Sequence, residues 1–250
     1  MIDNSSQSIN NIWVQYHSEI EEKLASGNDI ENFLKWMPIK KTMHAGGCNK
    51  IQFDTLRNSA YWNKWENALI EDSFGNPTRC QWHRETSYAA IYHAHTLSQI
   101  RPTGNVSDIK SVFEFGGGYG SMSRLIHRLG FNGTYTIYDL PALLQLQEIY
   151  LSKVRIPTDK ITLTDKLPKL DVDLFIAEWS LGESPMNLRD KVFENINFKE
   201  CVISFNSLFG GLKNLERFDD LVKSMPDYEW KLQPIEHLPD NYYLTGRRKK

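Results

Sequence analysis

The second half of the chain alternates between short β-rich runs and helix-like segments, and this alternation limits the fold more than any other feature. The β-rich runs are "SVFEF", "GTYTIYD", "KITLT", "DVDLFIAE" and "ECVISFN", and helix-like segments separate most of them. Strands that are joined through helices run parallel, because a parallel pair needs a long crossover connection. The pattern therefore predicts an α/β fold whose parallel sheet is covered by helices on both faces.

The end of the chain departs from this alternation. "YEWKLQPIEHLPDNYYLTGRRK" contains two extended runs that are joined only by the short turn "LPDN". Because so short a connection permits only an antiparallel pair, we expect the sheet to end in an antiparallel hairpin.

The first hundred residues are predicted to be mostly helical. "INNIWVQYHSEIEEKLASG" carries an apolar stripe with helical spacing that stops at Gly27, and "DIENFLKWM" begins with the cap candidate Asp29 and stops before Pro38. The segment "RPTGNVSD" crowds turn-forming residues together and marks a boundary. The sequence thus predicts a helical region over residues 1–104 and a sheet-containing core over residues 105–250.

Composition excludes several classes of protein. The 250 residues are 40% hydrophobic, enough for a sizeable core, and the formal net charge of −2 gives no basic footprint for nucleic acid. We see no start typical of a signal peptide and no apolar segment near the about 18 residues that span a bilayer. Three widely spaced cysteines fit a reducing compartment. We expect a cytoplasmic protein with no membrane insertion and no nucleic-acid partner, and oligomerisation stays open.

Four glycines crowd into five positions directly after the first β-rich run of the core, in "SVFEFGGGYGSMSRLI". Glycines let the backbone turn sharply and place no Cβ between a ligand and the amino terminus of a helix, although they also serve plain strand-to-helix turns. The dinucleotide fingerprint G-x-G-x-x-G fails, because Ser121 stands where its last glycine should be. No Gly-Lys-Ser/Thr follows, as a phosphate-binding P-loop would require. The match is instead E-x-G-x-G-x-G, from Glu114 to Gly120.

A carboxylate ends the next β-rich run, in "YTIYDLP". At the tip of that strand, Asp139 can accept hydrogen bonds from both hydroxyls of a ribose, or it can cap the helix that begins near Pro141.

Three motifs together resemble those of class I S-adenosylmethionine-dependent methyltransferases. "FEFGGGYG", "YDLP" and "FIAEWSLGESP" are similar to the first, second and fourth motifs of that class, over about residues 111–247. More narrowly, G-G-G-Y-G, D-L-P and W-S-x-x-E-x-P are similar to a group of bacterial proteins described as sugar O-methyltransferases. The resemblance implies a Rossmann-like seven-stranded sheet, S-adenosyl-L-methionine as cofactor, and methylation of a sugar or sugar-containing acceptor in polysaccharide biosynthesis.

The same resemblance implies a set of cofactor contacts. They are Glu114, Gly116, Gly118, Gly120, Asp139, Leu140 and Asp165. The glycines would line the methionyl and ribose parts of the cofactor, with Glu114 near its amino group. Asp139 would hold the ribose hydroxyls, Leu140 would lie against the adenine, and Asp165 or its neighbour Thr164 would reach the adenine edge.

The acceptor side should lie after the fourth and fifth β-rich runs, because ligands of open α/β sheets bind beyond the carboxyl ends of the strands. Glu183 is the first candidate for the base that removes the hydroxyl proton, and Glu178 is the second. Glu183 can instead cap the following helix, and Glu178 can contact the cofactor. Trp179, Ser180 and Asn206 are the candidate acceptor contacts, although Trp179 can also be a buried aromatic and Asn206 can also satisfy the loop backbone.

Histidines supply a further candidate base. His93 and His95 lie two residues apart in "YHAHTL", so they point from different faces of one helix. One of them, with His95 as the candidate, can face the cleft, or both can be ordinary helix residues. Ligand-like spacings also join His44, Cys48, Cys80 and His83. These pairs match no familiar zinc finger, and the fifth run lacks the acid that a divalent-ion site would need, so we expect no metal.

The leading hypothesis is therefore a sugar O-methyltransferase whose helical first region forms a lid and a wall of the acceptor pocket. Alternatives are a methyltransferase of another small molecule and a non-catalytic protein that keeps the cofactor fold for binding. A nicotinamide dehydrogenase is disfavoured by Ser121.

Overall fold

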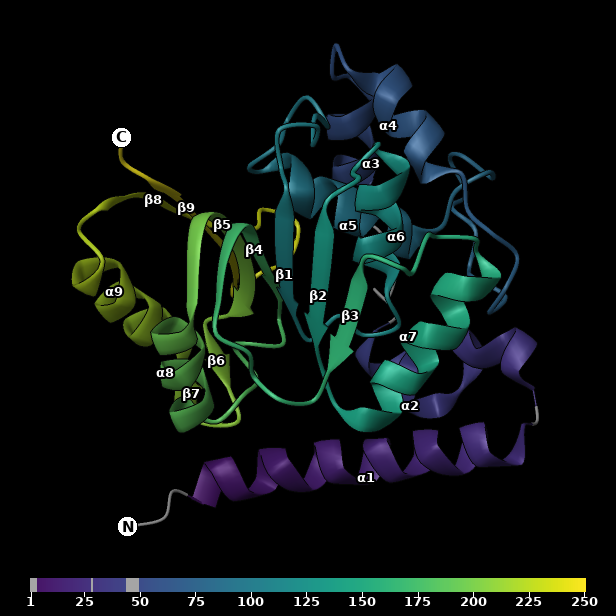
Figure 1. Ribbon diagram of the computed structural model, residues 1–250, viewed down its shortest axis with the longest axis horizontal. Helices are drawn as coiled ribbons and strands as arrows, with labels where there is room; N and C mark the ends of the chain where they lie inside the picture. Colours follow the sequence, from purple (N-terminus) through teal and green to yellow (C-terminus); the bar gives the residue numbers. More distant parts are fainter. Residues whose placement is uncertain (1–3, 28, 44–49) are drawn as a thin grey trace.

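Seven strands form one mixed sheet, in the order β3-β2-β1-β4-β5-β9-β8, in the computed structural model, which describes residues 4–27, 29–43 and 50–250 (Figure 1). The parallel strands are β1 (Ser111–Phe115), β2 (Thr134–Tyr138), β3 (Ile161–Thr164), β4 (Leu170–Glu178) and β5 (Ile196–Asn206). The antiparallel hairpin of β8 (Tyr228–Pro234) and β9 (Asn241–Arg248) adds to β5, and a separate ribbon pairs β6 (Leu208–Phe209) with β7 (Leu212–Lys213). The predicted α/β fold with its terminal hairpin is confirmed.

The described helices before the sheet are α1 (Asn4–Ser26), the 3₁₀ helix η1 (Ile30–Lys35), α2 (Met37–Thr42), α3 (Lys50–Arg57), α4 (Trp62–Leu69) and α5 (Tyr88–Ser98). Those within the core are α6 (Ser121–Arg128), α7 (Pro141–Lys153), α8 (Met186–Asn195) and α9 (Asn214–Ser224). In the part of the chain that the structure describes, no helix is both long and apolar enough to cross a bilayer.

The segment "DIENFLKWM" is helical with the predicted bounds: η1 has Asp29 at its N-cap position and ends at Lys35, before Pro38. It is a 3₁₀ helix, and the Asp29 side chain makes no capping bond: Asp29 has φ of 62°, and its carboxylate accepts a hydrogen bond of 2.6 Å from the Asn32 side chain. Pro38 lies in the first turn of the next helix, α2. Proline is tolerated there because the N–H groups of the first turn have no helical partner anyway.

Alternate side chains of each central strand enter two different hydrophobic layers. Leu174 and Ile176 of β4 pack in the cluster that contains α3, α4, α5 and α6, whereas Phe175 and Ala177 pack in the cluster that contains α8 and α9. Because both faces are covered, β4 needs an almost continuous apolar run. Helices from the first hundred residues thus share a hydrophobic cluster with the sheet, and the boundary near residue 104 stays a prediction.

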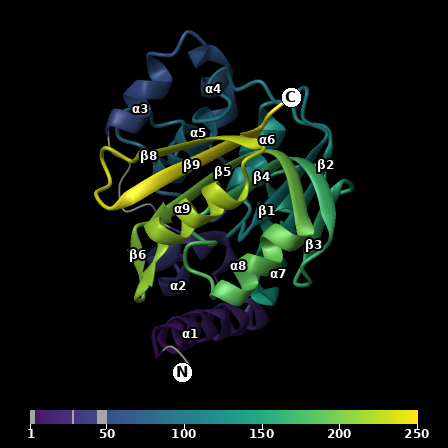
Figure 2. The ribbon, with the colours of Figure 1, turned by 90° about the vertical axis from the view of Figure 1, so that its left-hand side faces the viewer.

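The long helix α1 lies across the edge of the sheet at which the parallel strands end. Figure 1 and Figure 2 both show α1, in purple, at the bottom of the molecule. Its Ile20 is buried in a third cluster with Phe33 of η1 and Leu146 of α7. The first helix is therefore placed beside the region where a ligand of this fold class would bind.

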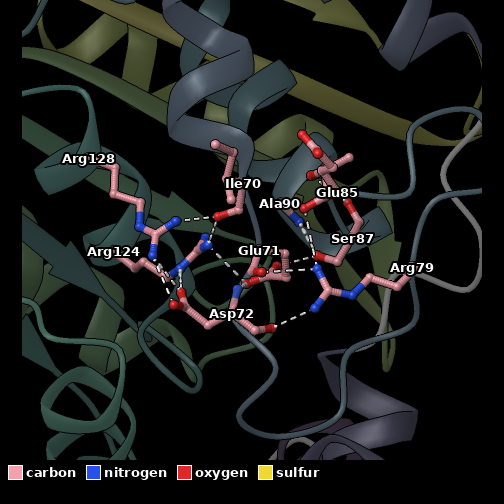
Figure 3. A network of polar contacts seen from close by, with 10 residues as sticks. Ile70, Glu71, Asp72, Arg79, Glu85, Ser87, Ala90, Arg124 and Arg128 are labelled. Carbon is pink, nitrogen blue, oxygen red and sulfur yellow. Dashed lines mark hydrogen bonds and ion pairs between the residues drawn. The ribbon is translucent and has the colours of Figure 1, made fainter.

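A network of polar contacts holds α5 and α6 together (Figure 3). The guanidinium of Arg124, in α6, is fully buried and contacts the carboxylates of Glu71 and Asp72. Glu71 also accepts a hydrogen bond from Ser87, the N-cap residue of α5. This network links the helix that follows the glycine loop to the start of α5.

Candidate active site

A cavity of about 300 Å³ opens beyond the carboxyl ends of β1, β2 and β4. The predicted site residues that line it are Gly116, Gly118, Asp139, Leu140, Glu178, Trp179, Ser180 and Glu183. The lining residues that we had not predicted include Trp13 of α1, Met43 just after α2, and Leu188 of α8. The structure thus brings the glycine loop, the β2 tip and the segment after β4 to one place.

The glycine loop needs glycine for two reasons. Gly116, Gly118 and Gly120 all have positive φ, of 73°, 59° and 96°, which side chains rarely adopt. A Cβ on Gly116 would also lie 2.3 Å from the Cβ of Ser180, whose hydroxyl donates to the Phe115 carbonyl. Ser180 therefore packs against the loop and fixes its position.

Asp139 is buried under the loop and orders it. Its Oδ2 accepts hydrogen bonds from the Gly118 N–H at 3.0 Å and from the Gln147 side chain at 2.9 Å, and its Oδ1 accepts one from the Leu140 N–H at 2.8 Å. Burial raises the pKa of Asp139 to about 7, although these bonds oppose the rise. Leu140, not Asp139, is the N-cap residue of α7 and makes no side-chain capping bond. Oδ1 keeps the capacity to accept a further hydrogen bond.

Glu114 lies directly beneath the loop without lining the cavity. A Cβ on Gly117 would be 3.1 Å from its Oε2, and its carboxylate accepts a hydrogen bond of 2.8 Å from the Tyr135 hydroxyl. Burial raises the pKa of Glu114 to about 8; the Tyr135 bond opposes the rise and the charge of Glu178 adds to it. The carboxyl group is therefore mostly protonated at neutral pH.

Glu178 ends β4 and contacts His93 of α5 through its Oε2. Burial lowers the pKa of His93, but the charge and hydrogen bond of Glu178 outweigh it, so the pKa lies above its ordinary value. The other carboxylate oxygen, Oε1, is buried and has no hydrogen-bond partner among the described residues. Glu178 thus pairs on one side with the His93 ring, whose pKa it raises, and borders the cavity on the other.

Glu183 lines the cavity without a hydrogen bond or ion pair to its carboxylate from any described residue. Burial alone raises its pKa to about 7. The helix that follows, α8, has Pro185 as N-cap residue and no side-chain capping bond, so the alternative role of Glu183 as a cap finds no support in its contacts. A carboxyl group with this pKa can gain or lose a proton near neutral pH.

Besides Glu114, four predicted site residues do not line the cavity: Gly120, Asp165, Asn206 and His95. Gly120 is the N-cap residue of α6. The Nδ1 atom of His95 lies 3.1 Å from the Tyr243 hydroxyl, and burial, with the nearby His237, lowers the pKa of His95 to about 4. The two histidines of α5 do point apart, but it is His93 that meets the site.

We expected no metal site, and the structure describes only two of the four residues whose spacing resembles that of metal ligands. His44 and Cys48 lie outside the described residues, whereas Cys80 is buried and the His83 ring lies 3.7 Å from the Glu66 carboxylate. Across residues 4–27, 29–43 and 50–250 we find no group of three or more His, Cys, Asp or Glu side chains that could hold a metal ion.

No family model matches the chain, and no curated protein matches its sequence. Solved structures do share its fold. A protein from Methanococcus maripaludis assigned as an S-adenosyl-L-methionine-dependent methyltransferase is 13% identical, with a TM-score of 0.50, over 65% of this chain and 87% of its own.

Two further structures are similar at lower scores. Precorrin-6y C5,15-methyltransferase from Geobacter metallireducens is 17% identical over 73% of this chain and 98% of its own, with a TM-score of 0.48. Mitomycin 7-O-methyltransferase is 13% identical over 79% of this chain and 72% of its own, with a TM-score of 0.46. At these identities the comparisons show the fold: the chain has the Rossmann-like fold of S-adenosylmethionine-dependent methyltransferases.

Proposed function

We propose that this protein transfers a methyl group from S-adenosyl-L-methionine to a hydroxyl of a sugar or sugar-containing acceptor. The observation that carries the proposal is that the glycine loop, Asp139 and Glu183 all line one cavity. This shared lining supports a cofactor site and a candidate base within reach of each other. The motif resemblance supports the sugar acceptor, and the helical first region, which contributes Trp13 and Met43, would cover the site.

The residues around the loop fit this cofactor, which carries a sulfonium and an ammonium group. Glu178 and Asp139 act electrostatically on Glu114, and the pKa values of Glu114 and Asp139, about 8 and about 7, allow both groups to ionise near neutral pH. A cationic ligand stabilises the ionised forms, so these carboxyl groups suit a cation. Gly118 would leave room for the cofactor, and Oδ1 of Asp139 would accept hydrogen bonds from the ribose hydroxyls. Leu140, which is 38% exposed, would lie against the adenine.

When bound, the cofactor supplies an activated methyl group on its sulfonium sulfur. The protein must hold the acceptor oxygen in line with that methyl, and positioning of this kind can contribute ~7–11 kcal/mol to catalysis. Glu183 would take the hydroxyl proton at its unpaired carboxylate, because its pKa of about 7 suits a base at neutral pH. Glu178 is less suited to that task, since it already pairs with His93.

A direct test of the proposed function combines binding and turnover. We expect titration calorimetry to show binding of S-adenosyl-L-methionine, and a panel of nucleotide sugars to show uptake of an isotopically labelled methyl group. Binding without uptake by any sugar or other small molecule would favour the non-catalytic alternative. Absence of cofactor binding would refute the proposal.

Removal of the Asp139 carboxylate should weaken cofactor binding. We expect Asp139→Ala to cost about 1.5–3 kcal/mol of binding free energy, the scale of hydrogen bonds to a charged group. Because the same substitution frees the Gly118 N–H and the Gln147 amide, the matched control is Gln147→Met, which removes the bonds of Gln147 to Asp139 and to the Gly118 carbonyl but keeps the Asp139 carboxylate. The control should lose stability in thermal unfolding but keep cofactor affinity within about twofold. Equal affinity in wild type and Asp139→Ala would remove Asp139 from the site.

Cofactor affinity should rise with pH between 6 and 7.5. In the free protein the pKa values of Glu114 and Asp139 are about 8 and about 7, so both carboxyl groups carry protons at pH 6. A ligand that favours the ionised forms must release these protons, and the association constant then grows by at most about tenfold per pH unit for each proton. The amino group of the cofactor, with an ordinary pKa of about 7.7–8.0, stays mostly protonated over this range. Calorimetry in buffers of different ionisation enthalpy should show proton release, and Glu114→Gln should reduce it. Proton uptake would contradict the assignment.

A further inference from the structure

Trp179 combines an unusual backbone with a fixed ring. It has φ of 59°, and a bulky residue in this region is a genuine outlier whose backbone is strained. The other described non-glycine residues with positive φ are Asp29, Asn76, Arg155 and Asp240. Trp179 is the aromatic one among them, and it lines the cavity. Strain of this kind persists where the surrounding contacts impose it, and it gathers at ligand sites.

Contacts from three other elements impose the position of Trp179. Its backbone N–H donates to the Ser204 carbonyl of β5 at 2.8 Å. Its indole Nε1–H donates to the side-chain oxygen of Asn241, the first residue of β9, at 2.7 Å. On α5, the Tyr92 ring lies 4.9 Å from the Trp179 ring, centroid to centroid, at an interplanar angle of 39°.

Asn241 is itself held in place. It is 6% exposed, its side-chain amide donates to the Pro239 carbonyl at 2.9 Å, and its backbone pairs with Asn206 at the end of β5. The residue before it, Asp240, is also left-handed, with φ of 61°, and accepts a hydrogen bond of 2.7 Å from the Ser207 N–H. The hydrogen bond between Trp179 and Asn241 thus joins two strained segments.

We infer that Asn241 and Tyr92 are positioning residues that hold the Trp179 ring as a rigid wall of the cavity, against which the C–H face of the acceptor sugar ring packs. This inference rests on the proposed function and deepens it. A ring that is fixed before the ligand arrives loses no rotational freedom on binding, so the acceptor binds more tightly than against a mobile ring. The acceptors that benefit are those with a flat apolar face.

Asn241→Leu tests the first positioning contact, because it keeps the approximate size of the side chain and removes the acceptor of the indole hydrogen bond. We expect KM for the sugar that the panel identifies to rise about three- to tenfold, the effect of ordering one side chain on binding. Cofactor affinity should stay within about twofold. Asn241→Asp keeps an oxygen opposite the indole N–H and should restore most of the acceptor KM. In a Trp179→Phe background, which keeps a ring without the N–H, Asn241→Leu should have no further effect on KM.

A second measurement needs no acceptor and no cofactor. The indole N–H of Trp179 can be identified by NMR from the signal that Trp179→Phe removes. We expect it to exchange with solvent at least about tenfold more slowly than a free indole, and we expect Asn241→Leu and Tyr92→Leu to accelerate it.

The outcomes separate this inference from the proposed function. Fast exchange of the Trp179 indole in the wild type, or an unchanged acceptor KM in Asn241→Leu, overturns the inference while cofactor binding and turnover stand. An equal loss of cofactor affinity and acceptor KM in Asn241→Leu also overturns it, because a general disturbance of the site would then explain both. If no sugar of the panel accepts a methyl group, the proposed acceptor class and the sugar-packing role both fail, and the exchange measurement alone decides whether the ring is held.

Discussion

Glu183→Gln should lower turnover by roughly 10²-fold or more while cofactor affinity stays within about twofold. Glutamine keeps the size of the side chain but cannot take the proton of the acceptor hydroxyl. The expectation follows from the position of Glu183 in the cavity and from its carboxylate, which no described residue binds. Turnover at saturating substrate and the melting temperature should be measured on the same preparation.

The pH profile of turnover gives an independent check on the same residue. Because burial raises the pKa of Glu183 to about 7, the carboxyl group is mostly protonated at pH 6 and ionised above pH 8. Turnover should therefore rise with pH through about 7 and then level off, and Glu183→Gln should lack this rise. A matched control is Glu194→Gln, which replaces an exposed carboxylate in α8 and should change neither the turnover nor its pH profile. Normal turnover with reduced stability in Glu183→Gln would refute the base assignment, and Glu178 would become the next candidate.

The sheet could be predicted from the sequence because its signals are local. A strand such as β4 that is covered on both faces must be apolar along most of its length. A short turn such as "LPDN" can join two neighbouring strands only as an antiparallel pair. At "DIENFLKWM" the helix and its bounds were predicted, whereas its 3₁₀ type and the absence of a capping bond from Asp29 were not, and this has an equally local cause. Asp29 can bond to the side chain of Asn32 as well as to the helix backbone, and periodicity does not separate a 3₁₀ turn from the start of an α-helix.

The parts of the candidate site that could be predicted are those that directly follow a strand of the sheet. The glycine loop and Asp139 follow β1 and β2 directly, so the order of strands was enough to place them together. The contacts of His93 with Glu178 and of Trp179 with Asn241 join residues far apart in the sequence, and no spacing between residues predicts these contacts. Trp13 belongs to the apolar stripe of α1, so its position at the cavity cannot be distinguished in advance from ordinary packing.

Arg124→Leu should destabilise the protein by about 3–5 kcal/mol in denaturant unfolding. The guanidinium is fully buried; its Nε donates to Asp72 at 2.7 Å, and its Nη2 lies 3.1 Å from the Glu71 carboxylate. Leucine fills part of the volume but leaves the buried Glu71 charge without its partner, and breaking a buried pair from one side typically costs this much. Arg124→Lys keeps the charge but not the planar fork that reaches both carboxylates, so it should recover only part of the loss.

Two further variants decide whether the charge of Arg124 or its packing matters. Arg128→Ala removes a partly exposed guanidinium from the same Asp72 carboxylate and should cost about 1 kcal/mol or less. The double variant Arg124→Leu with Glu71→Met removes both buried charges and should be more stable than Arg124→Leu alone, because no carboxylate is then left unpaired. A double variant that is less stable than the sum of its parts would show that packing, not charge, sets the loss.

If the loss of stability comes from the unpaired Glu71 charge, Arg124→Leu should also weaken cofactor binding. Glu71 connects Arg124 to Ser87 at the start of α5, and this helix places His93 and Tyr92 against Glu178 and Trp179, which line the cavity.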